Sequence, residues 1–176
     1  GAGNRCFDFR VPEEINRRIV DHTSDINLTY SEIARDYLLR EGLPPEQVIC
    51  TGSPMREVLE HYQPGIQASD VHARLGLEPG RYFVVSSHRE ENVDAQENLA
   101  RLFRVLDTVA ATYGLPVVVS VHPRTRKRME AAGLQAHANV QFHKPFGFLD
   151  YVRLQQDARA VLSDSGTITE ESSILN

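Results

Sequence analysis

Apolar positions along the chain switch between a strand-like spacing and a helix-like spacing. Residues 25–30 alternate apolar and polar side chains as a short strand does, and residues 48–51 form a second strand-like run. Between them, Ser31 is suited to cap a helix whose apolar residues share one face. Helices are also predicted from Pro12 to about Val20, and from Pro54 to Leu59.

The pattern weakens from His61 to Gly80, where prolines and glycines surround a short helix near 71–75. A new series then begins with an apolar strand at 82–86. It continues with a helix over 98–113, a strand over 116–121, a helix over 126–132, a strand over 140–142, a helix over 149–157, a strand over 160–162 and a final helix. We predict one domain part at 1–62, a linker at 63–80 and a second domain at 81–176.

This alternation predicts an α/β fold. Nearly continuous apolar strands separated by amphipathic helices are typical of a parallel sheet that is covered on both faces. Ligands of such sheets bind beyond the carboxyl ends of the strands. The turns that follow the strands are therefore the places to look for chemistry.

Composition narrows the function classes. The 176 residues are 41% hydrophobic and 24% charged, with 19 basic and 24 acidic residues and a net charge of −5. This balance gives no electrostatic case for a nucleic-acid partner. Cys6 and Cys50 lack the spacing of a metal site or a disulfide framework, and no apolar run reaches ~18 residues. We expect a cytoplasmic protein without a membrane segment, and a piece of a longer chain because a helical pattern is cut at Asn176.

The segment 163–171 is the most informative candidate site. An apolar strand runs into Ser163-Asp164-Ser165-Gly166, and a helix then opens at Thr167. Such a turn directs backbone N–H groups and the positive end of the helix dipole toward one point, which suits a phosphate. It has neither the Lys of a P-loop nor the spacing of a dinucleotide motif. The alternative is an ordinary helix start, with Thr167 and Glu170 as a capping box.

Two other strand ends carry histidines. His88 and Arg89 follow the strand at 82–86, and His122 follows the strand at 116–121. A histidine is a candidate acid or base near neutral pH, and an arginine can hold a phosphate through two hydrogen bonds. The alternative is a surface turn with local ion pairs, which contribute little. No metal site is predicted, because the chain has no cluster or helical spacing of metal ligands.

A pair of carboxylates, Glu13 and Glu14, opens the helix that begins at Pro12. Acidic residues in a first turn normally complement the helix dipole, and we expect that role for Glu14. A carboxylate that faces a cleft could instead act as a general acid or base.

Six motifs together resemble one family. They occur in the order and spacing of the non-hydrolysing UDP-N-acetylglucosamine 2-epimerases, across essentially the whole chain. Longer stretches of sequence at 3–8, 88–92 and 144–148 are most similar to one branch of this family, which serves capsule and O-antigen synthesis. Enzymes of that branch form UDP-N-acetyl-L-fucosamine from a UDP-linked 6-deoxy-talosamine. The six motifs are Ala2-Gly3-Asn4-Arg5, the run 12–17, Thr51-Gly52-Ser53-Pro54, Ser87-His88-Arg89-Glu90, Val121-His122-Pro123-Arg124, and Ser163-Asp164-Ser165-Gly166 with Glu170-Glu171.

The resemblance implies a fold and a reaction. The fold is a pair of Rossmann-like domains of the GT-B type in a cytoplasmic homodimer, of which this chain would hold the end of the first and most of the second. The reaction inverts carbon 2 of a UDP-linked 2-acetamido sugar by eliminating UDP and adding it back. The resemblance implies that the reaction uses no nicotinamide or other cofactor. It implies a UDP-sugar as the binding partner, and neither a nucleic acid nor a membrane.

The resemblance also assigns roles to residues. It implies that Glu13 is a catalytic acid or base and that His88 is the catalytic-site histidine. It implies that Ser165 and Gly166 contact the diphosphate, and that Glu171 binds the ribose hydroxyls. Two further residues, Arg89 and His122, lie in motifs that line the same cleft.

One position departs from the family pattern. The family has a catalytic Glu directly before Ala-Gly, whereas this chain has Gly1 there. The chain as written is therefore not expected to turn over alone. Two other functions stay open: a GT-B glycosyltransferase, which would need an acceptor site, and a UDP-sugar-binding module without catalysis. Gly1 favours the module, whereas Glu13 and His88 favour the enzyme.

Overall fold

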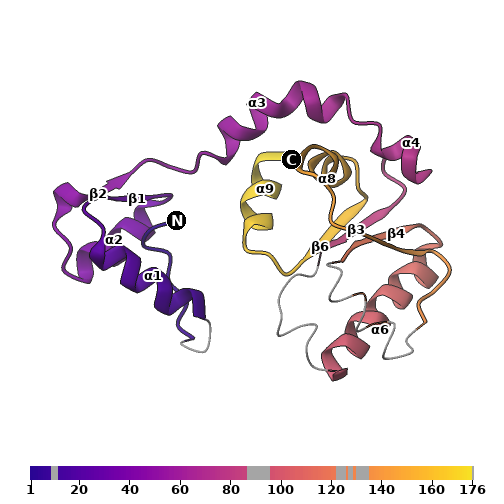
Figure 1. Ribbon diagram of the computed structural model, residues 1–176, viewed down its shortest axis with the longest axis horizontal. Helices are drawn as coiled ribbons and strands as arrows, with labels where there is room; N and C mark the ends of the chain where they lie inside the picture. Colours follow the sequence, from indigo (N-terminus) through magenta and orange to yellow (C-terminus); the bar gives the residue numbers. More distant parts are fainter. Residues whose placement is uncertain (9–11, 87–95, 122–125, 127–128, 130–134, 176) are drawn as a thin grey trace. The chain divides into compact units, whose positions relative to one another are not determined.

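The computed structural model describes residues 1–8, 12–86, 96–121, 126, 129 and 135–175. The chain divides into two compact units, Gly1–Val58 and Leu59–Asn176, each of which is described by itself. Figure 1 shows the elements of both units. In the described residues, no helix is both long enough and apolar enough to cross a membrane.

Unit 1 (Gly1–Val58) is built on two short parallel strands. They pair in register from Asn27 beside Val48 to Thr29 beside Cys50, and Ala2 adds a parallel bridge to Thr29. The strands occur where the alternating pattern predicted them. The elements in chain order are α1 (Pro12–Thr23), β1 (Asn27–Thr29), α2 (Glu32–Arg40), the 3₁₀ helix η1 (Pro45–Gln47), β2 (Val48–Cys50) and the start of α3 (Met55–Gln67).

Gly3 allows the N-terminal segment to lie against α2. Its φ is +73°, in the left-handed region that side chains rarely adopt, and a Cβ added to it would lie 2.2 Å from the carbonyl oxygen of Ala34. The adjoining helix α2 is capped as predicted, because the Ser31 side chain accepts a hydrogen bond from the Ala34 N–H. A glycine at position 3 is thus required by both the backbone conformation and the lack of space.

Unit 2 (Leu59–Asn176) contains a sheet of four described strands, all parallel. The spatial order is β5-β4-β3-β6, so the chain starts in the middle, moves to one side and returns to the other. This is the order of a Rossmann-like half, and it confirms the parallel sheet that the apolar runs predicted. The strands are β3 (Phe83–Ser86), β4 (Val117–Ser120), β5 (Val140–His143) and β6 (Ala160–Ser163).

Helices cover both faces of this sheet. Helix α6 (Gln96–Tyr113) packs on one face, where Leu106 and Ala110 contact a core that includes Val117 and Val119. Helices α4 (Val71–Leu75) and α8 (Phe148–Gln156) cover the other face, where Leu154 lies in a second core. Figure 1 shows β3, β4 and β6 with these helices and with α9 (Thr167–Leu175).

The segment 59–80 is more helical than its sequence indicates. Helix α3 was predicted to end at Leu59, yet it continues to Gln67 with Pro64 inside it. Packing explains the difference, since the Tyr62 ring meets Phe148 edge-on at 5.6 Å between ring centroids, and Leu149 approaches Gly65 closely. Contacts with α8 thus outweigh the unfavourable local sequence.

We expect Gly3→Ala to destabilise unit 1 by about 3 kcal/mol, because the new methyl group combines a strained φ with a clash against backbone. Hydrogen exchange of peptides from 1–58 measures this loss. Gly42→Ala is the matched control, since Gly42 has φ +95° but open space around the added Cβ, and it should cost only about 1 kcal/mol. Equal losses of protection in the two variants would contradict the close approach of Gly3 to α2.

Candidate functional site

The carboxyl ends of β3 and β6 meet at the point where the strand order reverses. Ser86 at the end of β3 is the register partner of Ser163 at the end of β6. The Asp164 N–H extends the pairing by donating to the Ser86 carbonyl oxygen at 3.3 Å. Reversal points of this kind are where open α/β sheets bind ligands.

Two hydrogen bonds within the segment hold the turn that follows β6. The Ser163 Oγ accepts a hydrogen bond from the Ser165 N–H at 3.1 Å, and the Ser165 carbonyl oxygen accepts from the Ile168 N–H at 3.4 Å. Helix α9 begins at Thr167, directly after Gly166. The N–H groups of a first helical turn have no acceptors within the helix, so this turn offers donors to an anion.

The capping-box alternative is not what the structure has. A capping box needs Thr167 at the position before the helix, whereas Thr167 is the first residue of α9. The Glu170 Oε1 is buried and has no hydrogen-bond partner among the described residues. The start of α9 at Thr167 therefore does not have the register that a capping box of Thr167 and Glu170 requires.

Glu171 lies one turn into α9, where a neighbouring helix orients its carboxylate. The Gln155 Nε2 of α8 donates to Glu171 Oε2 at 2.8 Å. Tyr151, also on α8, forms a hydrogen bond with Ser86 and interacts electrostatically with Asp164 and Glu171. Burial raises the pKa of the Tyr151 phenol, so the group stays neutral beside these carboxylates.

A pocket of about 410 Å³ opens at the same strand ends. Ser86, Ser163 and Asp164 border it on the sheet side, and the first half of α6 borders it on the other side through Asn98 and Arg101. Its volume is in the range of small-molecule sites. The turn after β6 and this pocket together form the candidate site of unit 2.

The predicted site residues fall into three groups. Ser165 and Gly166 lie directly before α9, and Glu171 lies within it, bonded to Gln155. Glu13 belongs to unit 1, where its side chain is exposed in the first turn of α1. The remaining three, His88, Arg89 and His122, lie outside the described residues. In the described part of the chain, no three His, Cys, Asp or Glu side chains are grouped as metal ligands.

Glu14 lies in the first turn of α1, where it was expected to complement the helix dipole, and it makes further contacts there. It is fully buried, with 0% of the residue exposed. Its Oε2 accepts from the Cys6 N–H at 2.8 Å, and its Oε1 accepts from Arg18 Nε at 2.6 Å. Burial alone would raise the pKa of Glu14, but the bonds from Cys6 and Arg18 outweigh burial and lower it. The Arg18 spacing of four residues is the one sequence signal that could have indicated this pairing.

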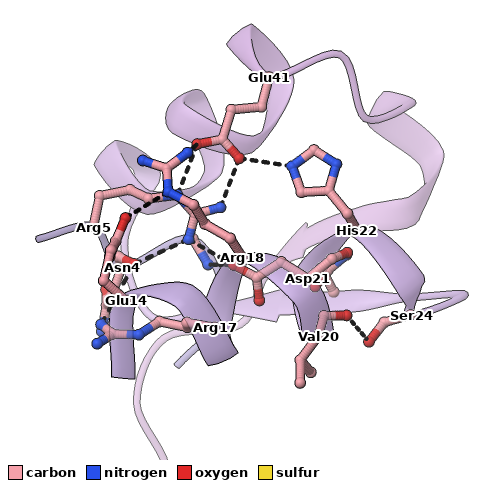
Figure 2. Close-up of polar contacts among 12 residues, drawn as sticks. Asn4, Arg5, Glu14, Arg17, Arg18, Val20, Asp21, His22, Ser24 and Glu41 are labelled. Atoms are coloured by element: carbon pink, nitrogen blue, oxygen red, sulfur yellow. Dashed lines mark hydrogen bonds and ion pairs between the residues drawn. The ribbon is translucent and has the colours of Figure 1, made fainter. Parts of the chain in front are cut away.

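Glu14 belongs to a larger cluster of charges around Arg5, shown in Figure 2. The Arg5 guanidinium bonds both carboxylate oxygens of Glu41 at 2.7 Å, and it bonds Asp21 Oδ2 at 2.7 Å. Only 1% of the Arg5 side chain is exposed. Hydrogen bonding from Arg5 lowers the pKa of Glu41 to about 2. This cluster joins the N-terminal segment, α1 and the end of α2.

The strand order and the turn at its reversal point define the class: an α/β protein with Rossmann-like domains of the GT-B type. The sequence profile of one family, described as UDP-N-acetylglucosamine 2-epimerase, matches residues 1–176, and the chain belongs to this family.

Individual relatives agree with this assignment. The structure of UDP-N-acetylglucosamine 2-epimerase from Rickettsia bellii is 46% identical with a TM-score of 0.87, over 98% of this chain and 46% of that one. The Methanocaldococcus jannaschii enzyme, solved in complex with UDP-GlcNAc and UDP, is 32% identical with a TM-score of 0.87, over 99% and 49%. A UDP-2,3-diacetamido-2,3-dideoxy-D-glucuronate 2-epimerase from Pseudomonas aeruginosa is 33% identical over 97% and 47%. The chain spans about half the length of the curated relatives it matches.

We expect unit 1 to lose stability as the pH falls from about 4.5 toward 2. The Glu41 pKa lies below its ordinary value in the folded state, so its contribution is complete above that ordinary value and disappears as the carboxylate is protonated. The loss should be roughly 2 kcal/mol, measured by hydrogen exchange of peptides from 1–58 across this range.

Two variants test the source of this pH dependence. Glu41→Gln removes the larger of two contributions, since the pKa of Glu14 is also lowered, and should reduce the pH dependence while lowering stability at pH 6. Glu46→Gln, at an exposed position of the same unit, should leave the pH dependence unchanged. A Glu41→Gln variant with the pH dependence of the parent protein would show that Arg5 and Glu41 do not stabilise unit 1 in this way.

Proposed function

We propose that the whole protein is a UDP-N-acetylglucosamine 2-epimerase, which inverts carbon 2 of a UDP-linked 2-acetamido sugar. The observation that carries the proposal is the Ser163–Gly166 turn, which opens α9 at the β3–β6 reversal point in a chain of the epimerase family. The M. jannaschii relative, solved with UDP-GlcNAc and UDP, supports a UDP-sugar as the substrate.

We propose that the diphosphate binds at the start of α9. We assign Ser165 and the N–H groups of Gly166 and Thr167, at the opening of α9, to the diphosphate. Glu171 accepts from the ribose hydroxyls through a carboxylate that Gln155 orients. His88, Arg89 and His122 complete the site in this proposal, on the strength of their motifs.

The reaction needs no external oxidant or reductant. A base takes the hydrogen from carbon 2 while the bond from carbon 1 to UDP breaks, which leaves a 2-acetamido-glycal and free UDP. UDP then adds back at carbon 1, and an acid returns a proton to the opposite face of carbon 2. We assign proton transfer to Glu13, and we assign stabilisation of the departing diphosphate to His88.

The sugar, the location and the assembly are finer parts of the proposal. UDP-N-acetylglucosamine is the first candidate substrate, and UDP-2-acetamido-2,6-dideoxy-L-talose is the second. Similarity of the motifs to the capsule and O-antigen branch supports the second sugar and a role in cell-surface polysaccharide synthesis. The same resemblance supports a homodimer in the cytoplasm.

Deuterium labelling tests the proposed reaction. The whole protein is incubated separately with each of the two UDP-sugars in deuterated water. We expect the true substrate to give the carbon 2 epimer with deuterium at carbon 2, as read by proton NMR. Transfer of the sugar to an added acceptor would identify a glycosyltransferase instead. Binding of the UDP-sugar without exchange at carbon 2 would identify a non-catalytic module, which is the function that Gly1 favours.

Substitution of Glu171 tests the nucleotide site. We expect Glu171→Ala to raise KM for the UDP-sugar by ~10-fold with little change in kcat, because the lost contact binds the ribose and not the reacting carbon. Gln155→Met removes the same contact between the helices but keeps the carboxylate, so it should raise KM clearly less than Glu171→Ala does. An equal rise of KM in both variants would mean that Glu171 only joins α9 to α8.

A further inference from the structure

The adjacent residues Glu13 and Glu14 occupy opposite environments. Glu13 is exposed in the first turn of α1, whereas Glu14 is fully buried. A buried carboxylate is costly unless hydrogen bonds and opposite charge compensate for the lost water. Glu14 meets this requirement with bonds to two different parts of unit 1. The proposed reaction uses Glu13 alone, so the role of Glu14 is unassigned.

The contacts of Glu14 fasten the N-terminal segment to the start of α1. Its Oε2 holds the Cys6 N–H at 2.8 Å, and its Oε1 holds Arg18 one turn further along the helix at 2.6 Å. Arg18 in turn contacts Glu41 Oε1 at 3.2 Å, which extends the connection to the end of α2. Figure 2 shows Glu14 and Arg18 beside the Arg5–Glu41 pair.

A second residue of α1 holds the same segment. Asp21 Oδ2 accepts from the Gly3 N–H at 3.0 Å and from Arg5 Nη1 at 2.7 Å. Glu14 and Asp21 are seven positions apart, which is about two helical turns. The segment 3–6 is therefore hydrogen-bonded to α1 at two positions about two turns apart. Because both positions are fixed, α1 cannot rotate about its axis relative to this segment.

Fixing Glu14 also fixes the direction of Glu13. Consecutive residues of a helix point about 100° apart around its axis. Once the Glu14 side chain is held inward by Cys6 and Arg18, Glu13 must leave the helix on an adjacent, solvent-facing side. Proton transfer requires a carboxylate oxygen within about 2.6–3.2 Å of the heavy atom that carries the transferred hydrogen. The direction of the Glu13 side chain therefore matters for catalysis.

We propose that Glu14 is a positioning residue of the epimerase reaction, which holds the first turn of α1 against the segment 3–6 so that Glu13 points at carbon 2 of the substrate. The inference rests on the proposed function. Glu14 acts through Glu13, and nucleotide binding belongs to unit 2. Its loss should therefore lower kcat much more than it raises KM.

Substitutions in the whole protein test this role. Glu14→Gln keeps the size of the side chain and an oxygen for the Cys6 N–H, but it turns an amide NH₂ group toward the Arg18 guanidinium. We expect kcat to fall by ~10²-fold with KM within a factor of about two, because a small misplacement of a catalytic group is costly. Glu32→Gln, an exposed carboxylate in the first turn of α2, is the matched control and should keep the parent kcat.

The decisive measurement compares the Glu13→Gln variant with a double variant that carries both Glu13→Gln and Glu14→Gln. If Glu14 works by aiming Glu13, Glu14→Gln should have almost no further effect on exchange at carbon 2 once Glu13 can no longer transfer a proton. A structural role would instead lower the rate by the same factor in both backgrounds. Multiplying effects in the double variant would overturn the inference, as would an unchanged kcat in the folded Glu14→Gln variant.

A milder variant covers the case in which Glu14→Gln does not fold. Arg18→Met removes the guanidinium from Glu14 but keeps the bond from Cys6, at a side chain that is 33% exposed. It should lower kcat by ~10-fold, and again only while Glu13 is present. A parent protein with no exchange at carbon 2 would overturn the proposed function and this inference together. An active parent with multiplying effects would overturn the inference alone.

Discussion

Pairing between β3 and β6 is the constraint on which the candidate site depends. The register from Phe83 beside Ala160 to Ser86 beside Ser163 joins two strands that lie far apart in the chain. Because β4 and β5 occupy the other side of β3, this pairing creates the reversal point of the strand order. The turn that opens α9 follows directly at that point, and the pocket bordered by Ser86, Ser163 and Asp164 lies at the same strand ends.

The two units contain different kinds of buried clusters. Unit 2 is held by two apolar cores on the faces of its sheet. In unit 1, the buried Arg5 lies between Asp21 and Glu41, and Arg18 lies between Glu14 and Glu41. Removing one partner from such a network leaves an uncompensated charge, which is more damaging than removing an exposed pair. Directional bonds of this kind are better suited than apolar packing to hold a carboxylate such as Glu13, to which we assign proton transfer, in one direction.

Sequence alone predicted the parallel sheet of unit 2, because short β-branched runs such as Val117, Val118 and Val119 alternate with amphipathic helices, as strands buried on both faces do. It also located the turn at Ser165, since a strand, a glycine and a helix start follow one another there. It missed the continuation of α3 past Pro64, which depends on contacts with α8 that local propensity does not include. It missed the burial of Glu14 for a related reason. One partner of Glu14 is the backbone N–H of Cys6, which no side-chain pattern reveals, and only the other partner, Arg18, follows at a spacing of four residues.

The substrates named for relatives in this family indicate which residues can select the sugar. The relatives include UDP-N-acetylglucosamine 2-epimerases and a UDP-2,3-diacetamido-2,3-dideoxy-D-glucuronate 2-epimerase. These names share the UDP group and the reacting carbon, and they differ in the substituents on carbons 3 and 6 of the sugar. Residues that we assign to the diphosphate, the ribose and carbon 2, such as Ser165, Glu171 and Glu13, meet the shared part and cannot distinguish these sugars. Specificity must therefore come from side chains that face the far side of the sugar ring, so the resemblance of shared motifs identifies the reaction more securely than the substrate.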